Sequence, residues 1–212
     1  MKKYHVDFAV VGSLLTIVFL LVVNLITSSD HLWFIYPALI LLFWPIRLYC
    51  LKKGKQQYFS IFSSLLIIVY LGIVNYINTP AYPWFLYAVY PIIWWPILVL
   101  LGKRAKSTIV ALIGSISIIL YYLCLNILLA PGHPWFIYPA FVVLWWPLSI
   151  YHARKKSYYA FSINGTILIS AFFITVNLIT SPQEIWAIYP IFGVLWWPLS
   201  VYYFVYKRKS EA

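Results

Sequence analysis

Residues 24–45 read NLITSSDHLWFIYPALILLFWP: an asparagine, a short polar turn, an aromatic cluster and an apolar run that ends in Trp-Pro. The pattern returns three more times at intervals of 51 residues, with no insertion or deletion between its landmarks. A fixed period of this length is typical of a repeated supersecondary unit. The sequence therefore predicts a single domain of four tandem copies, at residues 5–55, 56–106, 107–157 and 158–208.

Three side chains mark every copy. They are the asparagine, at Asn24, Asn75, Asn126 and Asn177; an outer tryptophan, at Trp33, Trp84, Trp135 and Trp186; and an inner tryptophan, at Trp44, Trp95, Trp146 and Trp197. A proline follows each inner tryptophan. In the last three copies another tryptophan precedes it, so all eleven tryptophans lie on or beside these marks.

The composition is too apolar for a water-soluble chain of this length. Of the 212 residues, 64% are hydrophobic and 9% are charged, and the mean hydropathy is +0.90. Each copy holds two apolar stretches of about 20 residues, which as helices are about 30 Å long, the thickness of the hydrocarbon core of a membrane. We predict an all-α polytopic membrane protein with eight transmembrane helices, at residues 8–27, 32–51, 59–78, 83–102, 110–129, 134–153, 161–180 and 185–206.

The four hairpins can close around an axis or stand in a row. All copies enter and leave on the same side, because each contains an even number of spans. Closure buries more helix surface per copy, so we favour a pseudo-fourfold bundle.

The fifteen lysines and arginines all fall at one end of the predicted hairpins. They are Lys2, Lys3, Arg47, Lys52, Lys53, Lys55, Lys103, Arg104, Lys106, Arg154, Lys155, Lys156, Lys207, Arg208 and Lys209. Cytoplasmic loops are enriched in basic residues, so we expect both termini and the basic loops in the cytoplasm. The net charge of +11 then reflects topology and attraction to anionic lipids, and we do not expect nucleic-acid binding.

The asparagine lies about one helical turn inside the end of each hairpin opposite the basic residues. An amide is costly in hydrocarbon unless it is hydrogen-bonded, so four copies at one depth need a common reason. One hypothesis is structural: the side chain bonds the backbone of the turn. The other is a polar ring around a central axis, which water, an ion or a solute would meet, formed by Asn24, Asn75, Asn126 and Asn177.

The inner tryptophan lies about 12 Å inside the basic boundary. The proline after it removes a backbone hydrogen bond and bends the helix. Small residues on the first helix, such as Gly12-Ser13 and Gly165-Thr166, allow close helix packing. Two interpretations stay open: packing aromatics, or a cavity for an apolar or cationic ligand framed by Trp44, Trp95, Trp146 and Trp197.

Catalytic patterns are absent from the sequence. The four carboxylates, Asp7, Asp30, Glu184 and Glu211, lie at or beyond the predicted span ends. No acidic pair, nucleophile set or phosphate-binding glycine loop is present, so we predict neither an enzyme nor a cofactor. Two turns carry a histidine, but further ligands are missing, and we predict no metal site.

The stretch from Asn24 to Pro37, followed by a Trp-rich second span, resembles the small bacterial two-transmembrane domain family. Members of that family carry an asparagine before a short turn and a Trp-Phe-x-x-Pro start to the second helix. The chain departs from the family in having four fused copies, and Trp-Trp-Pro in place of a glycine-rich inner half. The resemblance implies a bacterial plasma (inner) membrane location and a non-catalytic role, and it assigns no functional residue.

Two functions remain open at this point. The first is an integral membrane bundle that acts as a passive channel or conduit, or binds a small solute. The second is a scaffold, sensor or immunity-type protein that binds a membrane-protein partner or membrane lipids.

Overall fold

The computed structural model describes residues 3–28 and 31–207, and the secondary structure of these residues is entirely helical. This confirms the all-α prediction. The turn residues Ser29 and Asp30 lie outside the described residues, as do Glu211 and the basic residues Lys2, Arg208 and Lys209. The chain divides into two compact units, at residues 1–102 and 103–212, each of which holds two hairpins.

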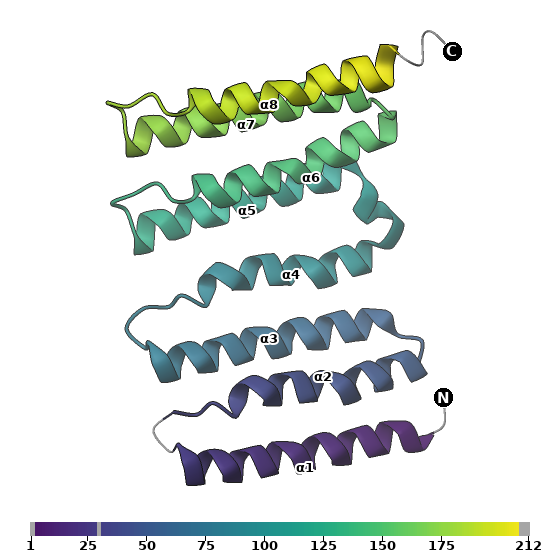
Figure 1. Cartoon of the computed structure of the whole chain (residues 1–212). Coiled ribbons are helices and arrows are strands. Elements are labelled where there is room, and N and C mark those ends of the chain that lie inside the picture. Colours follow the sequence, from purple (N-terminus) through teal and green to yellow (C-terminus); the bar gives the residue numbers. More distant parts are fainter. Residues whose placement is uncertain (1–2, 29–30, 208–212) are drawn as a thin grey trace. The chain divides into compact units, whose positions relative to one another are not determined.

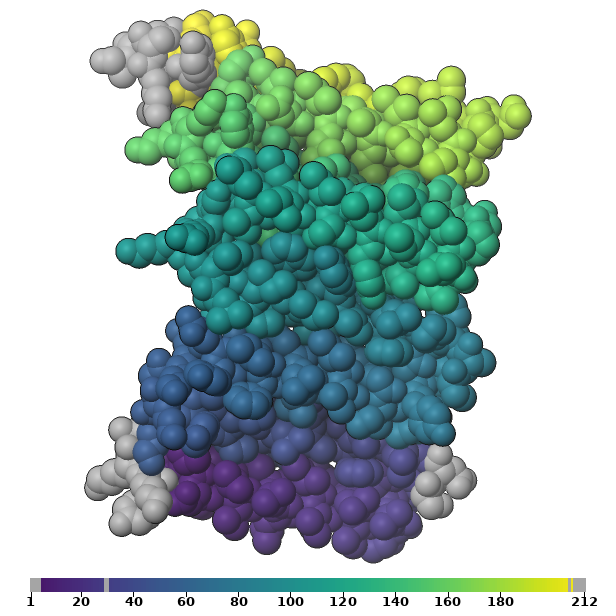
Figure 2. Space-filling model, turned by 180° about the vertical axis from the view of Figure 1, so that it is seen from behind, coloured from purple at the N-terminus to yellow at the C-terminus, as the bar shows by residue number. Residues whose placement is uncertain are grey.

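The first unit contains α1 (Lys3–Thr27), α2 (Ile35–Lys52), α3 (Gln56–Asn78) and α4 (Leu86–Leu101). Helix α1 pairs with α2 and α3 with α4, and α2 packs against α3 between the two hairpins (Figure 1). In Figure 2 the surface colours of this unit follow one another in bands from purple to blue, because consecutive helices lie side by side.

The second unit begins with a short 3-10 helix, η1 (Gly102–Lys106, whose first residue closes the first unit). It continues with α5 (Thr108–Leu129), α6 (Ile137–Lys155), α7 (Tyr158–Thr180) and α8 (Ile188–Val201), and ends in a π-helical segment, η2 (Tyr202–Lys207). The pairs are α5 with α6 and α7 with α8, and α6 packs against α7 between the hairpins.

Seven helical segments in the described ranges are long and apolar enough to cross a membrane, which indicates a membrane protein. Helix α6 is not among them. Its last turn carries His152, Arg154 and Lys155, which lower its hydropathy. The eighth predicted span, the pseudo-fourfold closure and the membrane orientation stay predictions.

The hairpins have two ends with different chemistry. At the turn end, the first helices end at Thr27, Asn78, Leu129 and Thr180, the residues at which the apolar stretches predict their ends. The second helices begin three residues later than predicted in each copy, because the outer tryptophan belongs to the turn. At the basic end lie Arg47 and the connections between hairpins, with Gly54 in the left-handed region at φ 63°.

Candidate functional site

An asparagine closes the turn of every hairpin. In the first hairpin, Asn24 Nδ2 donates to the carbonyl oxygens of Ser28 and His31 at 2.6 and 2.9 Å, and its Oδ1 accepts from the N–H of Phe34 at 3.0 Å. Phe34 is the N-cap residue of α2, so one side chain joins the end of the first helix to the start of the second. The same three bonds, at 2.6 to 3.1 Å, surround Asn75, Asn126 and Asn177.

The N–H groups of these amides are used in hydrogen bonds within their own turns. All four side chains are buried, with at most 6% of their surface exposed. Both N–H groups of each amide and one lone pair of its oxygen are in use. The structural hypothesis accounts for the asparagines, and the geometry leaves no free N–H to face a pore in the proposed ring of Asn24, Asn75, Asn126 and Asn177.

A hydroxyl on the first helix satisfies a carbonyl that proline leaves without a partner. Pro45 has no N–H, so the carbonyl four residues earlier, on Leu41, loses its helical bond. Ser13 Oγ, on α1, donates to that oxygen at 2.9 Å. The equivalent bonds are Ser64 to Ile92 at 3.3 Å, Ser115 to Val143 at 3.0 Å and Thr166 to Val194 at 3.5 Å, each four residues before a proline.

Sequence reasoning missed this pairing. It assigned the small residues to helix packing and the prolines to bending, as separate features. The available signal was a hydroxyl residue 32 positions before proline in all four copies. Within a membrane, such bonds help a spanning helix to accommodate a proline.

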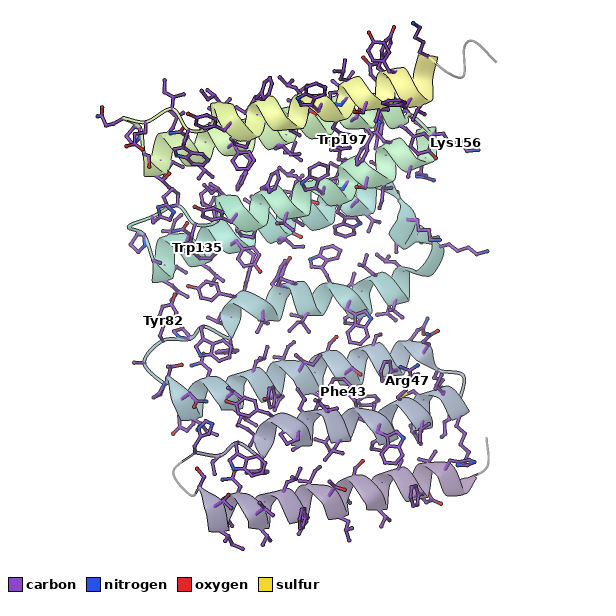
Figure 3. The ribbon with its side chains drawn as sticks, in the orientation of Figure 1. Phe43, Arg47, Tyr82, Trp135, Lys156 and Trp197 are labelled. Atoms are coloured by element: carbon purple, nitrogen blue, oxygen red, sulfur yellow. The ribbon has the colours of Figure 1, made fainter. Side chains whose placement is uncertain are left out.

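Three of the inner tryptophans pack against the first helix of their own hairpin, and Trp197 also lies 6.3 Å from Trp145 on α6. Trp44 meets Phe8 edge to face at 6.1 Å between ring centroids, and Trp197, labelled in Figure 3, meets Phe161 at 5.5 Å. A Cβ on Gly165 would lie 2.5 Å from Trp197 Cζ3, so the indole occupies the space that glycine leaves. Trp95 packs on Phe59 in the same way, and Trp146 is half-buried.

These contacts agree with the packing interpretation. The grooves described next are lined by other residues, and no cavity framed by Trp44, Trp95, Trp146 and Trp197 appears among them.

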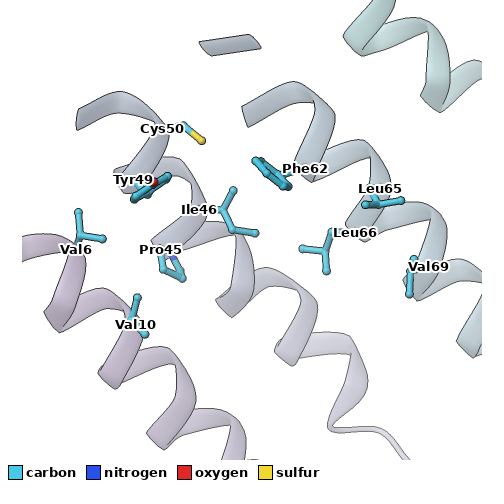
Figure 4. A pocket seen from close by; sticks show the side chains of 10 residues that line it. All are labelled: Val6, Val10, Pro45, Ile46, Tyr49, Cys50, Phe62, Leu65, Leu66 and Val69. Atoms are coloured by element: carbon cyan, nitrogen blue, oxygen red, sulfur yellow. The ribbon is translucent and has the colours of Figure 1, made fainter. Parts of the chain in front are cut away.

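An open apolar groove lies between the two hairpins of the first unit, in the half of the helices nearer the basic end (Figure 4). It has a volume of about 600 Å³. We call it the first groove. Its walls are Val6 and Val10 of α1; Pro45, Ile46, Tyr49 and Cys50 of α2; and Phe62, Leu65, Leu66 and Val69 of α3.

A smaller, charged hollow of about 240 Å³, which we call the rim, shares three lining residues with the basic end of the first groove. Tyr49, Cys50 and Phe62 line both spaces, and the rim adds Lys53, Lys55 and Tyr58. Each lysine ammonium lies over an aromatic ring: Lys53 Nζ is 5.2 Å from the Tyr49 centroid, and Lys55 Nζ is 4.9 Å from that of Tyr58. The rings hold two positive charges beside the mouth of an apolar groove.

The second unit has an equivalent second groove of about 370 Å³ between α5, α6 and α7. Eight of its nine lining positions lie 102 residues after a position of the first groove. They are Thr108, Leu112, Pro147, Leu148, Tyr151, His152, Asn164 and Leu168. The residues change from apolar to polar at three of these positions, where Thr108, His152 and Asn164 replace Val6, Cys50 and Phe62.

A hydrogen-bond network forms the polar wall of the second groove. His152 is buried, with 4% of its surface exposed, and its Nε2 lies 3.0 Å from Asn164 Nδ2. The amide is the donor, so the proton of the neutral imidazole is on Nδ1, which donates to Ser157 Oγ at 2.7 Å. The network joins α6 to α7 and therefore links the two hairpins of this unit. Ser157 lies 102 residues after Lys55, so the second groove lacks one of the two rim lysines.

In the part of the chain that the structure describes, no three His, Cys, Asp or Glu side chains come together as metal ligands. Sequence reasoning did not predict the grooves, because they arise from packing between hairpins rather than from a motif. No known family model matches the chain, and no curated protein or solved structure is significantly similar to it. The resemblance to the two-transmembrane domain family stays a prediction.

Proposed function

We propose that the protein is a non-catalytic membrane protein that binds lipid or another apolar small molecule in the grooves between neighbouring hairpins. The observation that carries the proposal is the first groove, about 600 Å³ of apolar space open on the face of spanning helices. Ligand sites of this size are mostly apolar with a few placed polar groups, which here are the groups of the rim. The recurrence of a groove at equivalent positions in the second unit supports a shared role.

The proposal includes the membrane arrangement. Eight spans form four hairpins, and both termini and all basic connections face the cytoplasm. The clustering of Lys and Arg at one end of the hairpins supports this orientation. The test uses the variant Arg104→Cys in a chain whose Cys50 and Cys124 are replaced by alanine. Its new thiol should react with a membrane-impermeant reagent only after the cells are opened. Labelling from outside intact cells would reverse the orientation.

A passive conduit is a weaker proposal. That proposal placed the asparagines around a polar constriction. Their amides instead hydrogen-bond the backbone of the turns, which weakens it. Vesicles containing the purified protein should therefore show the same solute permeability with wild type and with Asn→Leu variants that fold. A flux that requires these four side chains would favour the conduit.

Groove binding is tested directly by photocrosslinking. Purified protein in vesicles is irradiated with a phospholipid that carries a diazirine on its acyl chain, and labelled peptides are identified by mass spectrometry. Adducts should concentrate on the α2 and α3 segments that line the first groove. Adducts spread evenly over all lipid-facing helices would contradict the proposal.

A further inference from the structure

We propose that the first groove is a binding site for one anionic phospholipid, with an acyl chain against α2 and α3 and the phosphate at Lys53 and Lys55. The inference rests on the proposed function and gives it a ligand class. Three features carry it: the length of the groove, the unpaired charges of its rim and the contrast with the second groove.

The length of the first groove along the helices suits an acyl chain. Along α3 its wall runs from Phe62 to Val69, seven residues or about 10 Å of helix. One leaflet contributes about 15 Å of hydrocarbon, so the groove covers much of one leaflet beginning below the rim. The wall presents apolar side chains over this length, and its tyrosine, Tyr49, lies at the end where the rim begins.

The charges of the rim are available to an anion. Among the described residues, Lys53 and Lys55 make cation–π contacts and form no ion pair with a carboxylate. Asp7, exposed on α1 next to Val6, is paired with neither of them. Two ammonium groups at a membrane boundary attract an anionic headgroup, and a headgroup with a net negative charge balances them better than a zwitterionic headgroup does.

The second groove lacks this combination. Lys155 takes the place of Lys53 and lies in the same way over a tyrosine ring, that of Tyr151 at 4.4 Å, but Ser157 replaces Lys55, so one of the two positive charges is missing at this position. Asn164 stands where Phe62 lines the first groove, so the wall has a polar group at acyl-chain depth. The second groove therefore serves as an internal control for anionic lipid binding.

The test uses the full chain in phosphatidylcholine vesicles with trace amounts of two diazirine-bearing probes, phosphatidylglycerol or phosphatidylcholine. Four proteins are compared with wild type: the double variant Lys53→Ala/Lys55→Ala, its control Lys155→Ala, the groove-filling Val10→Trp, and its control Val11→Trp. Val11 is exposed on α1 and lies outside the groove lining, so it reports on indole insertion alone.

We expect phosphatidylglycerol to label the first groove more strongly than phosphatidylcholine. The double lysine variant should lower phosphatidylglycerol labelling about tenfold, since each lysine near a membrane surface contributes a severalfold attraction to anionic lipid, and should leave phosphatidylcholine labelling unchanged. Val10→Trp should lower labelling by both probes, and both controls should match wild type.

Two other outcomes overturn the inference in distinguishable ways. Equal labelling by the two probes, insensitive to the lysines but lost in Val10→Trp, removes the anionic headgroup while groove binding stands. Labelling of the first groove that no variant alters, or the absence of labelling there, removes both the inference and the proposed function.

Discussion

Asn75 in the first unit and Asn177 in the second make the same three hydrogen bonds, whereas Cys50 and His152, also equivalent in position, sit in different surroundings. The first pair belongs to the hairpin interior and the second to the groove between hairpins. Inside a hairpin, replacing the asparagine would leave three backbone polar groups without hydrogen-bond partners. In a membrane protein this restricts which residue can stand at that position. The side chain at the groove position holds no such backbone bond, so a cysteine stands there in one unit and a hydrogen-bonded histidine in the other.

The largest expected effect tests whether the turn asparagines stabilise the two units equally. Asn75→Leu and Asn177→Leu should each lower the free energy of unfolding by about 3 kcal/mol, because three backbone groups lose their partners and each unsatisfied group costs about 1–3 kcal/mol. The measurement is denaturant unfolding in detergent. Asn78→Leu is the control, because Asn78 is exposed and bonds only within its own helix, to Val74. Losses that differ strongly between the two units would break the equivalence.

The next effect should differ between the two units, because alanine fits at one of two equivalent glycines and not at the other. At Gly165 an added Cβ would lie 2.5 Å from Trp197 and 3.1 Å from Trp145, so Gly165→Ala should destabilise the protein by about 1–3 kcal/mol through overpacking. At Gly12 the nearest atom, on Trp44, would be 3.8 Å away, and alanine should be neutral or stabilising by up to about 1 kcal/mol. Thermal unfolding of the two variants side by side checks the difference, and equal shifts would contradict it.

A double-mutant cycle tests the pairing of hydroxyl and proline. Ser115→Ala should cost about 1 kcal/mol in the wild-type chain, because the Val143 carbonyl loses its donor. With Pro147→Ala, the restored backbone N–H can bond that carbonyl, so removing Ser115 should cost much less. The coupling energy from unfolding experiments should be about 1 kcal/mol. Additive losses would show that the hydroxyl does not replace the missing bond.

The smallest effect concerns the connection between hairpins in each unit. Gly54 has φ 63°, and Lys156, its equivalent in the second unit, has φ 52°, a left-handed conformation that a lysine adopts at a cost. Lys156→Gly should raise the free energy of unfolding by roughly 0.5–1 kcal/mol, and Gly54→Ala should lower it by about 1 kcal/mol. Lys155→Gly, one residue earlier and helical, should be destabilising and serves as the control.

The turn end of each hairpin could be predicted from the sequence because its chemistry is local. The breaker residues after Asn24 and its copies marked the ends of the first helices, and an amide near the turn had backbone groups within reach. The starts of the second helices were predicted three residues early, since hydropathy alone counts an outer tryptophan such as Trp33 as helical.

The contacts between helices were not predicted from the sequence, although the constant spacing of hydroxyl and proline residues was a signal for one of them. The bond from Ser13 Oγ to the Leu41 carbonyl joins two helices, so it depends on how α1 packs on α2. The grooves depend in addition on packing between hairpins, through α2 with α3 and α6 with α7. A repeat predicts similar hairpins, but it does not predict which neighbouring side chains leave space between them.

A crystal structure of the protein grown in a lipid phase that contains phosphatidylglycerol would test the central claim most directly. The account predicts elongated density along Phe62, Leu66 and Val69 in the first groove, continuous with phosphate density within hydrogen-bonding distance of Lys53 Nζ and Lys55 Nζ. A first groove filled by protein side chains, or by lipid whose headgroup lies away from both lysines, would contradict it.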